Sequence, residues 1–346
     1  AWSDRGWILD GAAVRVSIVG FVRGLQDHRV LDGRPVTVIN SDLTTTLNLV
    51  SARPLEENAS LSFIGPSPHG RFDIPASLAD RLLADQNSSS VSNADVVRPV
   101  VTALDIVRSN RNMWTIDFGV MSEKEAQVYQ SPYEYVRTRI FPERAKNRRK
   151  NYVDYWWQYG EARPGMRMKL ATLKRYISTP RVAKHRLFVW LPSNTLSNDG
   201  TVVFARDDDY FFGVLHARPH ELWALRMGTS LEDRPRYTPT TTFETYPFPW
   251  PPGQEPLNEA RVQAIAQAAQ ALVRLRDAWL NPAGASAAEL KKRTLTNLYN
   301  QRPTWLVQAH ARLDAAVFAA YGWPPNLADE EVLARLLALN LARAGD

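Results

Sequence analysis

The chain has 346 residues, of which 45% are hydrophobic and 23% charged, so it can bury the cores of two or three domains and is not a disordered chain. It contains no cysteine, which excludes disulfides, cysteine-ligated zinc, iron–sulfur clusters and thiol nucleophiles and indicates a reducing, cytoplasmic location. Its longest apolar runs are much shorter than the roughly 20 residues of a membrane helix, so we expect no membrane partner.

The net charge of +6 is distributed unevenly along the sequence. Residues 137–186 contain fifteen Lys and Arg but only three acidic residues, a local net charge of +12, and the rest of the chain sums to −6. A basic segment with interleaved aromatic residues, on an otherwise acidic chain, indicates a polyanionic partner. The alternative is a solvated basic face that binds nothing.

The first elements that the sequence predicts are strands. Within residues 13–21, apolar Val14, Val16 and Ile18 alternate with polar side chains, which is the pattern of a half-buried strand. Residues 36–39 form the second expected strand, after a turn at 31–35. Since a two-stranded hairpin alone is marginally stable in water, these strands should complete a sheet whose other strands lie upstream. The chain starts without a methionine or a signal peptide, so we expect it to begin inside a longer protein.

The segment from 41 to 112 is mixed. A helix is predicted over 75–85 from the spacing of its apolar residues, and the polar run 86–90 predicts a loop after it. The valine-rich residues 96–107 should form a strand or pack in a core.

Residues 114–250 are dense in Trp, Tyr and Pro, with short β-like runs at 187–190 and 201–205, which predicts an irregular β-rich domain with inserted helices. The proline-rich run 246–252 cannot continue a helix or a central strand and marks a boundary. Apolar residues at helical spacing follow it. The expected helices cover 262–279, 286–299, 304–321 and 328–343.

We therefore predict an α+β fold with three domains: 1–112, 113–252 and 253–346. No two of the seventeen glycines are two positions apart, so there is no Gly-x-Gly loop for a dinucleotide or for S-adenosylmethionine. The Walker A motif and the Gly-x-Ser-x-Gly elbow of serine hydrolases are missing as well. The sequence shows no complete catalytic site.

Two groups of residues superficially resemble metal sites. Asp207, Asp208 and Asp209 follow a short strand, but adjacent carboxylates at a strand end point in alternating directions and cannot all face one ion. His216 and His220 have helical spacing, but Pro219 lies between them and the usual His-Glu-x-x-His order of zinc ligands is absent. We expect no metal at either place.

Three basic segments are candidates for contact with nucleic acid. Residues 141–150 can contact several phosphates by releasing counterions, residues 175–186 mix cations with hydroxyls before a strand, and residues 234–242 have the same chemistry on a proline-constrained loop. The alternatives are a disordered basic loop for the first segment and, for the others, donors that satisfy local carbonyl groups. The selected residues are Arg144, Lys146, Arg148, Arg149, Lys150, Arg175, Lys184, His185, Arg186, Arg234, Arg236 and Tyr237.

The aromatic run 155–160 could stack on nucleobases, but such a cluster more often belongs to a hydrophobic core, and we expect the core role.

Taken in order, these segments resemble the MmeI-like restriction–modification DNA methyltransferases, which join adenine-specific methylation and target recognition in one polypeptide. Residues 2–17 resemble the last strands of the methyltransferase sheet, and 114–119 (Trp-Thr-Ile-Asp-Phe-Gly) the junction into the recognition region. The segments that resemble the recognition domain are 155–157, 175–180, 184–190, 207–216, 220–223, 236–239 and 243–250, and residues 321–324 resemble part of the helical tail. The family's cofactor loop and its Asn-Pro-Pro-aromatic catalytic motif have no counterpart in this sequence.

The resemblance implies sequence-specific recognition of double-stranded DNA within an N6-adenine methyltransferase that flips its target base and uses S-adenosylmethionine. It implies that this chain binds no cofactor, has no catalytic residue and is inactive alone, and that a methyltransferase region, with or without an endonuclease, lies upstream in the same polypeptide. Two alternatives remain open: a separate, non-catalytic specificity subunit that recruits a methyltransferase, and a carboxylate-metal nuclease that uses Asp207, Asp208 and Asp209.

Overall fold

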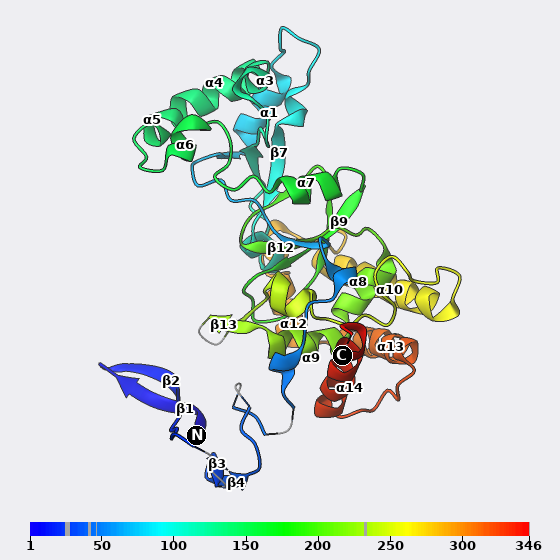
Figure 1. Cartoon of the computed structure of the whole chain (residues 1–346). Helices are drawn as coiled ribbons and strands as arrows, with labels where there is room; N and C mark the ends of the chain where they lie inside the picture. The colour runs from blue at the N-terminus through cyan, green and yellow to red at the C-terminus, as the bar shows by residue number, and fades with distance from the viewer. Residues whose placement is uncertain (25–27, 41–42, 46, 232–233, 346) are drawn as a thin grey trace. The chain divides into compact units, whose positions relative to one another are not determined.

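The structure, a computed structural model, describes residues 1–346 except 25–27, 41–42, 46, 232–233 and 346 (Figure 1). The chain forms two compact units, one of Ala1–Arg53 with Asn326–Asp346 and one of Pro54–Pro325. Helices and small, mostly antiparallel sheets occur together, which confirms the predicted α+β class. Among the helices that the structure describes, none combines the length and the apolar character needed to cross a membrane.

In its described residues, the first unit contains two short hairpins and one long helix. Strands β1 (Trp2–Leu9) and β2 (Ala12–Ile18) pair antiparallel around Asp10 and Gly11, which have φ values of 48° and 81°. Strands β3 (Arg29–Leu31) and β4 (Arg34–Val36) pair in the same way. Helix α14 (Asp329–Arg343) is joined to residue 53 by the Asn340 amide, which donates to and accepts from the Arg53 backbone.

The prediction of a strand over 36–39 that follows the first strand was wrong. The observed strand ends at Val36, and β2 pairs with β1, which the apolar–polar pattern did not identify as a strand. The reason is local: a two-residue Asp-Gly turn with positive φ at both positions folds the chain back at once, so each strand pairs with its immediate neighbour.

The second unit is built on two four-stranded sheets. The first has the order β10-β9-β12-β5 and is antiparallel throughout, whereas the second has the order β11-β7-β8-β6 and contains one parallel pair, β11 with β7. The strands are β5 (Ser62–Ile64), β6 (Asp73–Pro75), β7 (Val97–Val101), β8 (Met113–Ile116), β9 (Arg175–Pro180), β10 (Val189–Pro192), β11 (Leu196–Ser197) and β12 (Thr201–Phe204). A further hairpin consists of β13 (Thr229–Leu231) and β14 (Arg234–Arg236).

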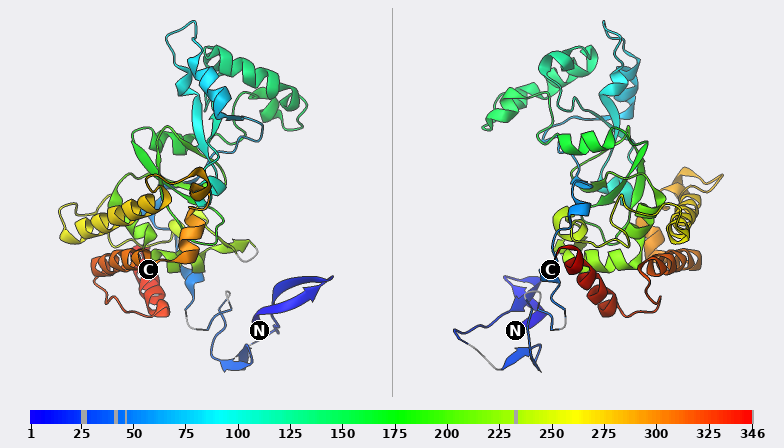
Figure 2. Two further views of the ribbon diagram at one scale, coloured as in Figure 1. Left: turned by 180° about the vertical axis from the view of Figure 1, so that it is seen from behind. Right: turned by 45° about the vertical axis from the view of Figure 1, so that its right-hand side comes forward.

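The helices of this unit precede, interrupt and follow the sheets (Figures 1 and 2). They are α1 (Ala76–Ala84), α2 (Ala103–Val107), α3 (Glu123–Gln127), α4 (Gln130–Arg139), α5 (Phe141–Arg144), α6 (Lys150–Asp154), α7 (Pro164–Leu170), α8 (Asp209–His216), α9 (Arg218–Met227), α10 (Ala260–Leu280), α11 (Ala287–Leu290), α12 (Leu295–Gln301) and α13 (Thr304–Tyr321). The predicted helices over 75–85, 262–279 and 304–321 are confirmed by α1, α10 and α13. The predicted helix over 286–299 is divided into α11 and α12, because the Thr294 side chain caps the start of a new helix.

The predicted domain boundaries at 112/113 and 252/253 both lie inside the second unit. Strands from the two sides of residue 112 share sheets: β7 pairs with β8, and β5 pairs with β12. Across residue 252, helix α8 packs so closely on α10 and α13 that a Cβ added at Gly213 would lie 2.7 Å from Cγ2 of Ile265. The three-domain division therefore stays a prediction about function.

The aromatic run 155–160 lies mostly in the core, as predicted. Trp156, Trp157 and Tyr159 are buried in one hydrophobic cluster with Phe72 and Phe118, and only Tyr155 is exposed. This cluster holds helix α4 against the sheet that contains β6, β7 and β8.

Candidate nucleic-acid interface

The loop between α5 and α6 presents four of the predicted cations to solvent. Lys146, Arg148, Arg149 and Lys150 are all exposed, although Arg149 also donates to the Tyr152 hydroxyl oxygen at 3.3 Å. Asn147 accepts the Arg149 backbone N–H, which shapes the turn. Exposed cations on such a surface are suited to phosphate contact, which positions a duplex without reading its sequence.

Arg144, from the same segment, is a correction to the sequence analysis. Its side chain is only 3% exposed, and it donates to the carbonyl oxygens of Pro68 (2.7 Å) and His69 (3.3 Å). Its guanidinium lies over the ring of Tyr152, and burial lowers its pKa. Arg144 therefore joins the loop that contains Pro68 to α5 and is not part of the solvent-facing surface.

The β13–β14 hairpin carries three further candidates, whose side chains differ in exposure. Arg234 is exposed and Arg236 is half-buried, but Tyr237, which follows β14, is only 1% exposed. Since the Leu215 carbonyl oxygen accepts from His220 Nδ1, His220 Nε2 must accept a hydrogen bond from the Tyr237 hydroxyl at 3.0 Å. Tyr237 thus anchors the hairpin from inside, and its selection for DNA contact is not supported.

Around strand β9, two candidates have local hydrogen-bond partners. Arg175 donates to the Asp207 carbonyl oxygen and to Asp209 (2.9 Å), and its guanidinium lies 3.8 Å from the centre of the Trp190 ring. Arg186 is only 8% exposed and donates to three oxygen atoms of the chain. Its selection for DNA contact is therefore also corrected.

The other two candidates of this segment, Lys184 and His185, lie at one edge of α12. Lys184 is exposed and His185 is half-buried, and both contact the Asn300 amide oxygen, at 2.7 and 2.9 Å. Both remain accessible for a ligand.

The carboxylates of the first group that resembles a metal site are engaged in hydrogen bonds within the chain. Asp208 caps α8 and accepts from Arg206, and Asp209 accepts from Arg175 and Gln270. No cluster of three or more His, Cys, Asp or Glu side chains suited to a metal occurs among the residues that could be described.

The same applies to the two histidines, which are buried in the core. His216 accepts from the Phe188 backbone N–H and from Arg276. Burial lowers the pKa of His220 to about 3. These histidines are neutral core residues, and a zinc role is not supported.

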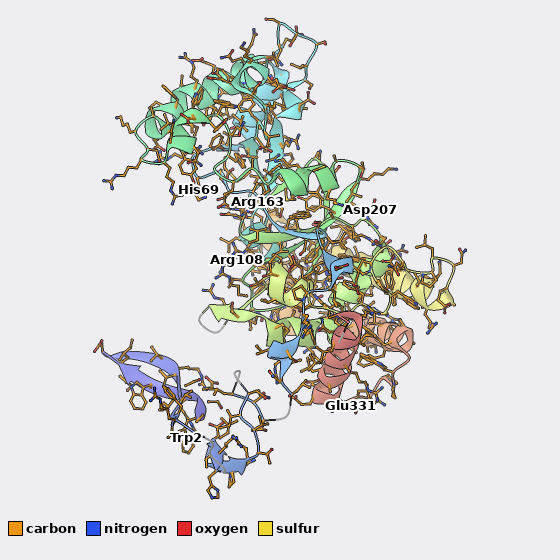
Figure 3. All side chains as sticks on the ribbon, viewed as in Figure 1. Trp2, His69, Arg108, Arg163, Asp207 and Glu331 are labelled. Atoms are coloured by element: carbon orange, nitrogen blue, oxygen red, sulfur yellow. The ribbon has the colours of Figure 1, made fainter. Side chains whose placement is uncertain are left out.

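Two of the segments that carry exposed candidates, the α5–α6 segment and the β13–β14 hairpin, lie on one side of the second unit. In Figure 1 the α5–α6 segment and the β13–β14 hairpin are on the left, and both are on the right when the unit is seen from behind in Figure 2. Figure 3 labels His69 and Arg163 on this same side, between the heights of α6 and β13. Helices α10 and α13 extend to the other side in both views.

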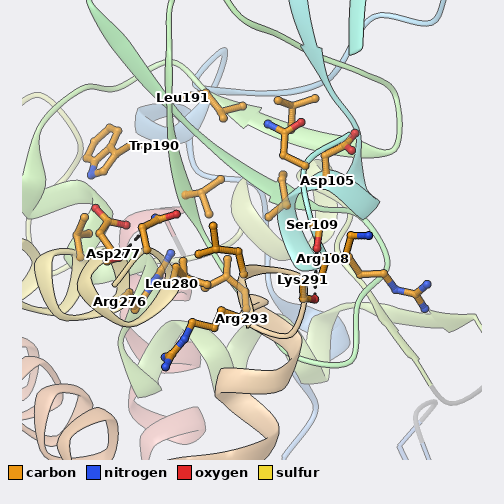
Figure 4. Close-up of a pocket in the computed structure, with 18 of the residues that line it drawn as sticks. Asp105, Arg108, Ser109, Trp190, Leu191, Arg276, Asp277, Leu280, Lys291 and Arg293 are labelled. Carbon is orange, nitrogen blue, oxygen red and sulfur yellow. Dashed lines mark hydrogen bonds between the residues drawn. The ribbon is translucent and has the colours of Figure 1, made fainter. Parts of the chain in front are cut away.

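A cavity of about 650 Å³ lies between α2, β10, α10 and the segment around α11 (Figure 4). Arg108 and Lys291 are exposed there, and Arg293 donates to the Trp279 carbonyl oxygen. Burial acts to raise the pKa of Asp105 in its wall, but hydrogen bonds from Arg111 and Thr102 outweigh this and hold that pKa well below its usual range. The cavity thus combines an apolar wall with cations and resembles a binding surface more than a catalytic centre. The sequence analysis missed Arg108 and Lys291 because each lies outside the basic segments.

The second unit is therefore an α+β scaffold with exposed cations gathered from the α5–α6 loop and the β13–β14 hairpin, a combination suited to binding a polyanion. Among solved structures, that of the type IIL restriction-modification enzyme MmeI in complex with DNA is similar to this chain, with a TM-score of 0.74 and 20% sequence identity. The match covers 100% of this chain but 46% of the MmeI chain, so this chain spans less than half the length of that enzyme. The likeness shows a shared fold. Neither the protein-family models nor the curated proteins gave a match.

Proposed function

We propose that this chain is the DNA-recognition part of a restriction–modification methyltransferase and that it binds double-stranded DNA. The observation that carries the proposal is the shared fold with an enzyme whose structure was solved with DNA, over the whole length of this chain. The exposure of Lys146, Arg148, Arg149, Lys150 and Arg234 supports it, because contact with phosphates needs solvent-exposed cations.

The finer proposal is that the intact protein transfers a methyl group from S-adenosylmethionine to the N6 amine of a flipped adenine. The cofactor loop and the catalytic motif would lie outside this chain. The chain would bind the duplex and recognise its sequence, and it would be inactive alone. Exposed cations of the α5–α6 loop would contact phosphates, and the β13–β14 hairpin would enter the major groove.

The exposed apolar side chains of the β1–β2 hairpin support the proposal that a catalytic region packs on it. Trp7, Ile8 and Leu9 of this hairpin are 53%, 75% and 58% exposed, and exposed apolar patches of this kind mark contact surfaces. We propose that this hairpin completes the sheet of the methyltransferase region of the same polypeptide.

The test of DNA binding is fluorescence anisotropy with duplex DNA over a salt series. Lys146→Ala with Arg148→Ala should flatten the slope of log K against log salt by about 0.9 for each phosphate that the protein no longer neutralises. A charge-matched control, Arg274→Ala with Arg312→Ala, removes two exposed cations from α10 and α13 and should leave the slope nearly unchanged. Equal effects of the two double variants would mean that only net charge matters, and absence of binding at low salt would refute DNA recognition by this chain.

The test of the finer proposal is transfer of labelled methyl groups from S-adenosylmethionine to DNA. The isolated chain should transfer none. Transfer by the pure chain would show that it contains a catalytic site and would contradict its proposed role.

A further inference from the structure

Three arginines from distant parts of the sequence meet beside the β13–β14 hairpin. Arg181 follows β9, and Arg236 ends β14. The two are joined through the backbone, because Val182 forms a β-bridge with Arg236 and the Tyr237 N–H donates to the Arg181 carbonyl oxygen at 2.7 Å. Neither Arg181 nor the third arginine, Arg163, was selected from the sequence.

A chain of hydrogen bonds connects Arg181 to Arg163. Arg181 Nη1 donates to the Asp199 carbonyl oxygen at 3.0 Å, and the Asp199 carboxylate accepts from the Ser67 hydroxyl at 2.7 Å. Ser67 pairs through its backbone with Glu161, at 3.0 Å in both directions, and the Glu161 carboxylate forms an ion pair with Arg163. Five residues from four separate segments are thereby linked through backbone and side-chain bonds, with Arg236 at the edge of the network.

The charges in this network do not balance. Arg163, Arg181 and Arg236 supply three positive charges, whereas Glu161 and Asp199 supply two negative ones. Burial, and then repulsion by Arg236 and by Arg163, lower the pKa of Arg181, although Asp199 and Glu161 act in the opposite direction.

Two arginines of the network, Arg236 and Arg163, are accessible to a ligand. Within the part of the chain that the structure describes, the Arg236 guanidinium has no hydrogen bond or ion pair, and its side chain is half-buried and so retains access to solvent. Arg163 is likewise accessible, with a side chain that is 35% exposed.

The excess of one positive charge matches a monoanion with several acceptor oxygens. Guanidinium groups donate in a planar fork that suits the paired oxygens of a phosphate, and a neutral base would not relieve the repulsion between cations. We propose that Arg163, Arg181 and Arg236 together bind one phosphodiester group of the DNA backbone. This inference rests on the proposed function and extends it by assigning a backbone-contacting role to residues under the hairpin.

The first test uses the salt dependence of duplex binding. The double variant Arg163→Gln with Arg236→Gln should flatten the slope of log K against log salt by about 0.9, the value for a single phosphate, and not by twice that amount. The double control Arg274→Gln with Arg312→Gln should not change the slope, and urea unfolding should show that both proteins remain folded. An unchanged slope in the Arg163/Arg236 variant would overturn the proposal. So would a loss of affinity for only one base sequence at constant slope, because that result would assign Arg236 to base reading.

The second test separates this inference from DNA binding as a whole. Diethyl phosphate, a phosphodiester monoanion, is titrated into the full chain while arginine Nε–H signals are followed by NMR. The single variants Arg163→Lys, Arg181→Lys and Arg236→Lys assign the three arginine signals, because each variant lacks one of them. Saturable shifts of these assigned signals would support the site even if the duplex did not bind. If the duplex binds but no such shifts occur, the proposed function stands and the three-arginine site is refuted.

Discussion

Replacement of Arg186 should destabilise the protein and should lower its affinity for DNA without changing the salt dependence of binding. The guanidinium donates to the Thr179 hydroxyl at 3.0 Å and to the carbonyl oxygens of Pro180 (2.6 Å) and Pro235 (3.3 Å), and it lies over the ring of Tyr237. It therefore holds β14 against the end of β9 from inside.

The magnitude follows from two opposing effects. Burial lowers the pKa of Arg186 from its ordinary value to about 10, which corresponds to a cost of about 3 kcal/mol for keeping the charge inside. Against this, hydrogen bonds from a charged donor contribute roughly 1.5–3 kcal/mol each, so three of them outweigh the cost. Arg186→Ala leaves the three oxygens without their donor and opens a cavity, and we expect a loss of about 3–5 kcal/mol in the free energy of unfolding.

Two assays on the same samples test this prediction. Urea unfolding should show the loss of stability, and anisotropy should show weaker binding with the salt slope of the original protein, because Arg186 contacts no phosphate. Lys184→Ala is the matched control, since it removes an exposed cation from the same loop and should change stability by less than about 1 kcal/mol. Unchanged stability together with a slope that is flatter by about one unit would refute the reasoning and place Arg186 on the DNA.

Three further predictions concern the scaffold. Gly213→Ala should lower the free energy of unfolding by about 1–3 kcal/mol, measured in urea, because the new Cβ would lie 2.7 Å from Ile265 Cγ2. Ile265→Ala removes this carbon and should make the Gly213 substitution less destabilising, whereas additive effects of the two substitutions would contradict the packing argument. His220 has a folded-state pKa of about 3, below its unfolded value of 6.5, so the free energy of unfolding should fall as pH decreases below 6.5, by about 2 kcal/mol from pH 7 to pH 5. His220→Gln should lose this part of the pH dependence. An unchanged pH profile in this variant would show that His220 is not buried as a neutral group. Asp117→Asn breaks an ion pair in which both carboxylate oxygens contact Arg167, at 2.6 and 2.9 Å. It should lower the free energy of unfolding, measured by heat or urea, by about 3–5 kcal/mol. A decrease of less than about 1 kcal/mol would mean that solvent compensates for the ion pair.

The sequence by itself determined the elements whose signals are local. Apolar residues at helical spacing located α1, α10 and α13, and the tryptophans at 156 and 157 were correctly expected in the core. The α+β class followed from the same signals. These predictions succeeded because periodicity and side-chain hydrophobicity depend only on residues near in sequence. The pairing of β1 with β2 could have been found from Asp10-Gly11, a turn signal that was used only at Asp32-Gly33.

Which cations face solvent was decided only by the tertiary structure. Arg144, Arg186 and Arg148 are equally polar in the sequence, yet the first two are buried and the third is exposed. A buried guanidinium needs acceptors, and for Arg144 and Arg186 these include the carbonyl oxygens of residues 68 and 235, which are far away along the chain. Arg163, Arg181 and Arg236 likewise meet only because loops from separate parts of the chain fold together. Burial and charge repulsion depend on distances in space, and no local pattern encodes them.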